Sequence, residues 1–238
     1  MAQFIDIHCH LLPGVDDGAQ TPEQALALLQ MAREDGTAAV VLTPHYRGKY
    51  RQNTPTQLRN ALRSLQAIAP KDMALYLGNE IAYEKDIGEK MTEQKILSIN
   101  DGQFVLLEFD FSTTCYQAAD AVSELLGSGY TPIIAHMERY DAFVKNREFV
   151  DILLHQGALI QINADSVLGR WGFSVKRFCH WLLKSRRAHF IASDAHDLND
   201  RPPKLSECFN YIQKKYGPDY AAALFWENAR VVLEDRNR

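Results

Sequence analysis

The chain has 238 residues, a mass of 27.0 kDa and an apolar share of 46%, which is enough for a sizeable core. Its formal net charge of −4 and pI of about 6.1 argue against a protein that holds nucleic acid by phosphate neutralisation alone. No apolar run is long enough to cross a bilayer, and the N-terminus enters a predicted strand at once. We therefore expect neither a membrane-embedded chain nor a signal peptide.

The four cysteines are far apart and form no CxxC pair. This usage predicts reduced thiols in a cytoplasmic protein. None of them has an arginine six positions later, which excludes the phosphatase loop built on a cysteine nucleophile. The residues concerned are Cys9, Cys115, Cys179 and Cys208.

Short apolar segments alternate with helical patterns along the chain. Strands are predicted near residues 4–7, 38–42, 74–77, 104–107, 132–135, 158–162 and 189–192. Helices are predicted near residues 22–35, 55–69, 116–126, 147–155, 175–184, 201–216 and 220–227, and residues 83–99 as a helix or loop. This alternation predicts an α/β fold with a parallel sheet. Seven regular βα steps favour one domain over residues 1–238, closed as a barrel.

The first predicted strand runs into His8-Cys9-His10. Two histidines two residues apart on a strand point to the same face, so both imidazoles can reach one metal ion. Taken alone, His-x-His is a weak signal, because a pair of polar residues at a strand end is common.

The later predicted strands end in a similar way. Six of the seven end on a candidate ligand, and only the sixth ends on neutral groups, Gln161 and Asn163. In parallel α/β folds, function collects at the carboxyl ends of the strands, and a barrel aims these side chains at one point. The candidates are His8, His10, His45, Glu80, Glu108, His136, Asp194 and His196. The remaining histidines, His155, His180 and His189, are expected to be structural.

A set of imidazoles and carboxylates this large exceeds one tetrahedral site. Mixed nitrogen and oxygen ligands favour zinc, manganese or iron over magnesium or calcium, so we expect two or three such ions. Clustered divalent ions lower the pKa of a bridging water and neutralise oxygens around phosphorus. Arg139, Arg201 and, more weakly, Arg47 are candidates for a phosphate clamp, each with a surface or helix-start position as the alternative.

Four motifs in order resemble a known family. They are His8-Cys9-His10, the turn from Pro13 to Gly18, Ile134-Ala135-His136-Met137-Glu138-Arg139-Tyr140, and Ala192-Ser193-Asp194-Ala195-His196 followed by Arg201-Pro202-Pro203. Together they resemble the bacterial metal-dependent protein-tyrosine phosphatases of the PHP (polymerase and histidinol phosphatase) superfamily, of the CpsB/CapC type. The resemblance covers residues 5–228, nearly the whole chain.

The resemblance implies a distorted (β/α)7 barrel of the PHP type that binds three divalent ions, usually manganese or iron. By position, the first ion would take His8, His10, Glu80 and Asp194. The second would share Glu80 and add Glu108 and His136. The third would take Asp17, His45 and His196, with Asp16 as the alternative to Asp17. Arg139 and Arg201 match the phosphate-contacting arginines of the family.

The resemblance also implies a function. A metal-activated hydroxide would attack the phosphorus of phosphotyrosine in line, without a phospho-enzyme. The implied substrate is the tyrosine-rich C-terminal tail of a cognate bacterial tyrosine kinase that drives capsular or exopolysaccharide synthesis. The basic and aromatic loop at residues 46–51 either grips such an acidic peptide or is merely solvated.

Several alternatives stay open. A phosphatase of histidinol phosphate or another small molecule belongs to the same superfamily. A proofreading exonuclease fits the acidic balance poorly. From other classes, the chain could be a non-catalytic metal-binding regulator of polysaccharide assembly, or an amidohydrolase, since those barrels also open with His-x-His.

Overall fold

The computed structural model describes residues 3–235, a mixed α/β fold. Its strands are β1 (Phe4–Cys9), β2 (Thr37–Leu42), β3 (His45–Tyr46), β4 (Ala74–Leu77), β5 (Glu80–Ala82), β6 (Phe104–Glu108), β7 (Thr131–Ile134), β8 (Leu159–Asn163) and β9 (Phe190–Ala192). Its α-helices are α1 (Pro22–Glu34), α2 (Pro55–Ile68), α3 (Ile87–Thr92), α4 (Cys115–Gly127), α5 (Asp141–Lys145), α6 (Glu148–Gln156), α7 (Ala164–Leu168), α8 (Phe173–Lys184), α9 (Ser206–Tyr216), α10 (Pro218–Ala222) and α11 (Asn228–Glu234).

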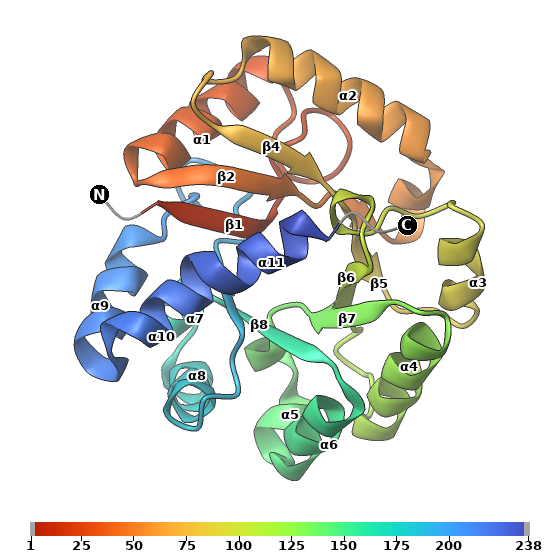
Figure 1. The fold of residues 1–238 in the computed structure, drawn as a ribbon, viewed down its shortest axis with the longest axis vertical. Coiled ribbons are helices and arrows are strands. Elements are labelled where there is room, and N and C mark those ends of the chain that lie inside the picture. The colour runs from red at the N-terminus through yellow and green to blue at the C-terminus, as the bar shows by residue number, and fades with distance from the viewer. Residues whose placement is uncertain (1–2, 236–238) are drawn as a thin grey trace.

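The strands form two parallel sheets that curl around a common centre, with most helices outside (Figure 1). One sheet has the order β1-β2-β4, and the other has the order β3-β5-β6-β7-β8-β9. The segment after β9 returns to β1, because the Asp194 amide donates to the His8 carbonyl at 2.9 Å and the His10 amide donates to the Ala195 carbonyl at 2.8 Å. The ends of the curled sheets therefore meet beside the first histidine pair.

All seven predicted strands have counterparts, and two short strands, β3 and β5, were not predicted. They continue the paths of β2 and β4 after a break at residues 43–44 and 78–79. Pro44 has no backbone N–H to continue the ladder of β2, and the Asn79 side chain donates to the Pro44 carbonyl at 2.8 Å. After the break, both segments join the second sheet, where His45 pairs in register with Glu80.

The helix starts follow the expected capping chemistry. Thr54 and Thr114 both form capping boxes at the starts of α2 and α4. Helix α9 begins at Ser206 rather than beside Pro202, because the amides of Leu205 and Ser206 donate to the Asp35 side chain and the two preceding prolines stay outside the helix. The predicted last helix is longer than expected, since α10 and α11 are joined by a π-helical turn at Ala223–Glu227.

The interior of the curled sheets is apolar at one end and polar at the other. Ile5, Ile7, Leu106 and Ile133 belong to one buried cluster, to which α11 contributes residues including Val232. Figure 1 shows α11 crossing in front of the ring of strands. The opposite, carboxyl-terminal ends of the strands are left for polar side chains. Within the described residues, none of the helices has the length and hydropathy that crossing a bilayer requires.

Candidate metal centre

A bulge in β1 aims the first two histidines at the strand-end rim. Asp6 pairs with Val40 and Cys9 with Leu42, so three steps along β1 match two steps along β2. The extra residue shifts the alternation of side chains, and Cys9 leaves the interior face on which Ile5 and Ile7 lie. His8 and His10 turn toward each other instead, with their Nε2 atoms 3.2 Å apart.

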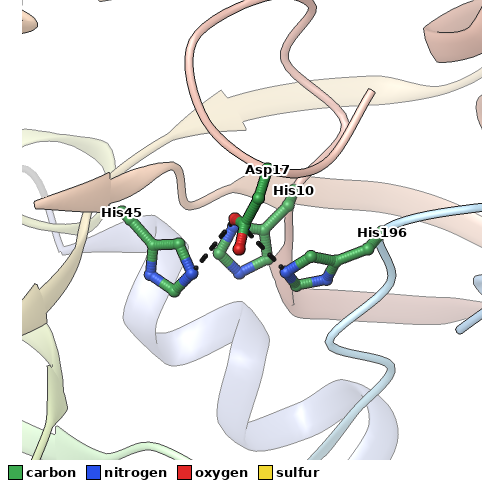
Figure 2. A group of neighbouring side chains, drawn as sticks. All are labelled: His10, Asp17, His45 and His196. Atoms are coloured by element: carbon green, nitrogen blue, oxygen red, sulfur yellow. Dashed lines mark ion pairs between the residues drawn. The ribbon is translucent and has the colours of Figure 1, made fainter. Parts of the chain in front are cut away.

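Three histidines surround Asp17 at this rim (Figure 2). The Nε2 atom of His45 lies 3.3 Å from the Asp17 Oδ1 atom, and that of His196 lies 3.7 Å from it. The His10 ring stacks at a tilt between them, 4.4 Å from the His45 ring centre and 4.0 Å from that of His196. One ligand atom from each of these four residues lies within 4.8 Å of the others, a spacing that one metal ion can span.

Glu80 lies at the centre of the remaining candidates. Its Oε1 atom is 2.7 Å from His136 Nε2 and 3.3 Å from His8 Nε2. Its Oε2 atom is 2.7 Å from His45 Nδ1 and 3.3 Å from His10 Nε2. Three further groups could hold an ion: His8, His136 and Asp194; His8, His10 and Glu80; and His45, Glu80 and Glu108. Every residue predicted as a ligand therefore lies in at least one of the four groups.

The burial and hydrogen bonding of the ligand atoms favour a bound cation. His45 Nδ1 and Glu80 Oε2 are buried and 2.7 Å apart, close enough for an ion pair, but neither atom forms a hydrogen bond. Buried polar atoms without partners are costly, and a shared cation would satisfy both of them. The mixture of imidazole nitrogens and carboxylate oxygens suits first-row transition metals.

Two adjacent aspartates have different roles in this geometry. The Asp16 side chain accepts hydrogen bonds from His10 Nδ1 at 2.7 Å and from the His45 amide at 3.1 Å. Such a carboxylate holds the imidazole proton on Nδ1 and leaves Nε2 free for a metal. Asp17 instead faces His45 and His196. The geometry thus favours Asp17 over Asp16 as a ligand, and Asp16 as the residue that orients His10.

Two candidate ligands adopt strained backbone conformations. His136 has a φ of 31° and Asp194 has a φ of 54°, both in the left-handed region that side chains with a Cβ rarely enter. Such residues cost about 1–3 kcal/mol each and persist where the surrounding structure fixes them. Here the strain turns both side chains from the strand ends into the cluster.

Both predicted clamp arginines contact the same carboxylate. Arg139 Nη1 lies 3.0 Å from Asp194 Oδ2, and Arg201 Nη2 lies 2.6 Å from Asp194 Oδ1. The Arg139 Nε atom is buried without a hydrogen-bond partner, and its guanidinium carbon lies 4.4 Å from the centre of the Trp171 ring. Two guanidinium groups thus lie at the edge of the cluster with N–H donors available for a ligand.

The loop at residues 46–51 is tied to the same rim. Arg47 Nη1 lies 3.2 Å from Glu108 Oε1, and Arg51 Nη2 lies 2.7 Å from Glu84 Oε2. Both arginine side chains are 42% exposed, so each pair is partly screened by solvent. The loop therefore places positive charge beside the cluster.

The cluster shifts the proton affinities of its members. Burial lowers the pKa of His45, but the negative charge of Glu80 and the hydrogen bond with Asp17 raise it more, to about 9. Burial raises the pKa of the Glu80 carboxyl, but the charges of His8 and His45 bring it well below its usual value. Glu80 is therefore ionised at neutral pH and His45 carries a proton.

Other members shift in the opposite direction. Burial lowers the pKa of His196, and the positive charges of His10 and Arg201 lower it further, to about 3. Burial and the negative charge of Glu80 raise the pKa of Glu108. His196 therefore presents a neutral imidazole, which is the form that binds metals.

We expect metal affinity to rise with pH. A metal that binds His45 through nitrogen must displace its proton, and the pKa of about 9 means that this proton is present below that pH. Each proton released raises the apparent affinity about tenfold per pH unit until the pH passes the pKa. Competition with a chelator between about pH 6 and pH 9 measures this slope. An affinity that is flat across the range would contradict it.

The histidines expected to be structural lie elsewhere. His155 Nδ1 contacts the Asp151 carbonyl, His180 Nδ1 the Tyr216 hydroxyl, and His189 Nδ1 the amide of Ile160. All four cysteines are buried free thiols.

Some residues at the site escaped the sequence analysis. The Tyr140 hydroxyl lies 3.1 Å from His136 Nδ1, and Trp171 covers Arg139. Tyr140 lies four positions after His136, a spacing that can bring two side chains together in a helical turn. Nothing in the sequence marked Trp171.

Comparisons with known proteins match the whole region just described. The chain matches the family model described as "Capsular polysaccharide synthesis, CpsB/CapC" over residues 4–234. It is 33% identical to the tyrosine-protein phosphatase CpsB of Streptococcus pneumoniae, across 98% of this chain and 99% of that protein. It is 31% identical to the tyrosine-protein phosphatase YwqE of Bacillus subtilis, across 98% and 92%.

Solved structures agree with the sequence matches. One is a crystal structure described under YwqE of Bacillus subtilis and CpsB of Streptococcus pneumoniae as metal-dependent tyrosine phosphatases. That structure superposes on this chain with a TM-score of 0.91 at 30% identity, and the match covers 98% of this chain and 95% of the other. A histidinol phosphate phosphatase from Lactococcus lactis, at 15% identity, TM-score 0.55 and 99% and 95% coverage, shares the fold alone. On the sequence and family matches, this protein belongs to the CpsB/CapC family of capsular polysaccharide synthesis.

Proposed function

We propose that this protein is a protein-tyrosine phosphatase that uses divalent metal ions bound at the carboxyl-terminal rim of the strands. The proposal rests on one observation: candidate metal ligands and arginine side chains lie side by side at this rim. Four overlapping sets of ligand atoms lie at this rim, two of them including Glu80, and two arginines contact Asp194 beside them. Metal clusters with adjacent guanidinium groups suit the transfer of a phosphoryl group.

Three ions would account for the ligand atoms, divided among them as the family resemblance implies rather than as the four groups divide them. His8, His10, Glu80 and Asp194 would hold the first, and Glu80, Glu108 and His136 the second. Asp17, His45 and His196 would hold the third, with the His10 ring beside them. Manganese is proposed as the ion, and iron and zinc suit the same donors. Such ions supply Lewis acidity, which lowers the pKa of water toward neutrality and offsets charge on phosphoryl oxygens.

The arginines bind and orient the phosphate. Arg139 and Arg201 each contact Asp194 through one nitrogen, which leaves further N–H donors of both guanidinium groups for a phosphate. A guanidinium fork matches two oxygens of a phosphate group, and the unpartnered Nε atom of Arg139 is an additional donor. Both side chains are mostly buried, at 17% and 27% exposed, so their charges act with little screening.

The leaving group favours an aryl phosphate. The phenol of tyrosine has a pKa of about 10, so a departing phenolate needs less protonation than an alkyl alkoxide. Arg139 and Arg201 supply positive charge beside the cluster. This arrangement supports phosphotyrosine as the substrate class.

The family supplies the biological setting of the proposal. The substrate would be the C-terminal tail of a cognate bacterial tyrosine kinase, and the phosphatase would regulate capsular or exopolysaccharide synthesis from the cytoplasm. The chain would act as one domain over residues 1–238. The two curled sheets would amount to a distorted (β/α)7 barrel of the PHP type, with β3 and β5 as continuations of β2 and β4.

Substrate preference tests the proposal directly. With manganese-loaded protein, we expect kcat/KM for a phosphotyrosine peptide to exceed that for histidinol phosphate by at least about tenfold, a difference of about 1.4 kcal/mol in transition-state stabilisation. Steady-state kinetics on both substrates measures the ratio. A preference for histidinol phosphate would assign the protein to small-molecule metabolism instead.

A further inference from the structure

Strand β8 (Leu159–Asn163) ends at the metal centre without offering it a ligand. Its last inward side chains are the amides of Gln161 and Asn163, which are 0% and 1% exposed. Fully buried amides are costly unless all of their polar atoms are hydrogen-bonded. The partners of these two amides therefore show what the strand contributes.

The two amides connect candidate ligands from opposite sides of the cluster. Gln161 Oε1 lies 2.8 Å from the His136 amide nitrogen and 3.2 Å from His8 Nδ1. Gln161 Nε2 donates to Asn163 Oδ1 at 2.7 Å. Asn163 Nδ2 donates to Asp194 Oδ2 at 2.9 Å. A continuous path, here called the amide relay, thus runs from His8 through Gln161 and Asn163 to Asp194.

The direction of the amide relay is forced at both ends. The backbone N–H of His136 can only donate, so the Gln161 atom that faces it must be the oxygen. The carboxylate of Asp194 can only accept, so the Asn163 atom that faces it must be the nitrogen. The bond between the two amides then joins a nitrogen to an oxygen, as observed. Turning either amide over would set two like groups against each other.

This direction fixes the proton of one histidine. His8 Nδ1 faces an amide oxygen, so Nδ1 must carry the hydrogen. Metal binding requires the neutral ring, and the proton that His8 then loses comes from the other nitrogen, Nε2, which is left bare. It points at Glu80 Oε1, at 3.3 Å, and at Asp194 Oδ1, at 3.4 Å. His8 is thereby held in the tautomer that can bind a metal among those carboxylates.

The other end of the amide relay orients the carboxylate. Asn163 and Arg139 both bind Asp194 Oδ2, at 2.9 and 3.0 Å. The second oxygen, Oδ1, faces His8 Nε2 at 3.4 Å and also pairs with Arg201 Nη2 at 2.6 Å. The same two amides therefore present one nitrogen and one oxygen to the same space.

We propose that Gln161 and Asn163 are positioning residues that set the His8 tautomer and the Asp194 orientation before metal binds. The proposal depends on the metal centre of the proposed function but not on phosphotyrosine as the substrate. Partners that orient metal ligands typically contribute about 10–100-fold to metal affinity. Strand β8 thus takes part in the centre through neutral amides, where the neighbouring strands supply imidazoles and carboxylates.

Three variants test the amide relay through the affinity for Mn²⁺, measured by competition with a chelator. Gln161→Met keeps the approximate shape and removes both hydrogen-bonding ends, so we expect affinity to fall about 10–100-fold. Gln161→Glu keeps an oxygen for His8 Nδ1 but sets its second oxygen against Asn163 Oδ1, so it should recover only part of the affinity, at least about threefold over Gln161→Met. Gln156→Met makes the same replacement on α6, where Gln156 bonds to Ser123, and should leave the affinity unchanged.

A spectroscopic measurement covers the case in which Gln161→Met fails to fold. In Zn²⁺-loaded Gln161→Glu, the His8 Nδ1–H proton signal should move downfield relative to the unmodified protein, because a carboxylate accepts a stronger hydrogen bond than an amide. An unmoved signal would overturn the proposal. So would equal affinities for the Gln161→Met, Gln161→Glu and unmodified proteins, or a Gln161→Glu affinity as weak as that of Gln161→Met. If these results hold while phosphotyrosine is not hydrolysed, only the proposed substrate is wrong.

Discussion

Replacing Glu80 with glutamine is expected to lower the number of metal ions bound and to reduce phosphotyrosine hydrolysis by about 10³-fold or more. Glu80 lies within 3.3 Å of nitrogens from four histidines and takes part in two of the groups that could hold an ion. The amide keeps the shape but loses the charge that a shared ligand needs. Metal ions supply several kcal/mol to such reactions, and each 1.36 kcal/mol is a factor of ten.

Elemental analysis together with turnover measures this effect. Glu84→Gln is the matched control, because Glu84 binds Arg51 on the neighbouring loop and belongs to none of the groups that could hold an ion. It should keep the full metal content and activity. If Glu80→Gln keeps its metal content and activity, Glu80 is not a ligand shared by the metal ions.

The second large effect is expected at Arg139. Changing it to alanine should lower kcat/KM for a phosphotyrosine peptide by about 10²–10³-fold, the usual cost of removing one donor to developing charge. Metal content should stay the same, because Arg139 supplies no ligand atom. Its removal takes away only an ion pair with the Asp194 carboxylate. Arg139→Lys should restore only part of the activity, since an ammonium cannot form the two-pronged contact.

Arg147→Ala is a suitable control for this series. Arg147 packs over the ring of Trp181, 4.9 Å from its centre, and has no place in the metal centre. If Arg139→Ala and Arg201→Ala both leave aryl phosphatase activity untouched, the protein is better explained as a non-catalytic metal-binding regulator of polysaccharide assembly.

Much of the arrangement at the rim could be predicted from where the strands end. His45, Glu80 and Glu108 each follow an apolar run, and parallel strands bring their carboxyl ends to one edge whatever the details of pairing. That argument needs only the order of elements. It therefore holds even though the structure divides the strands between two sheets.

The sequence could not predict the two short strands. Strands β3 and β5 are two and three residues long, too short for any periodic pattern. Their pairing depends on contacts such as the one between Asn79 and Pro44, which are far apart in the chain. These strands place His45 in register with Glu80, so part of the geometry of the site was beyond local reasoning.

Neighbouring residues of the same type were also hard to tell apart. Asp16 and Asp17 offer the same carboxylate, and only the backbone direction decides which one orients His10 and which one faces His196. Gln161 and Asn163 stood out in the sequence only as the strand end without a ligand. Their partners on other strands give them a role, and those contacts require the folded chain.

Metal ions at the strand-end rim are expected to enable the hydrolysis of phosphotyrosine. Turnover of a phosphotyrosine peptide by the full chain, measured before chelation, after chelation and after manganese is added back, tests this dependence. We predict that chelation abolishes turnover and that manganese restores it, with the metal content following the activity. Full turnover by protein shown to contain no metal would mean that the hydrolysis does not depend on metal ions at this rim.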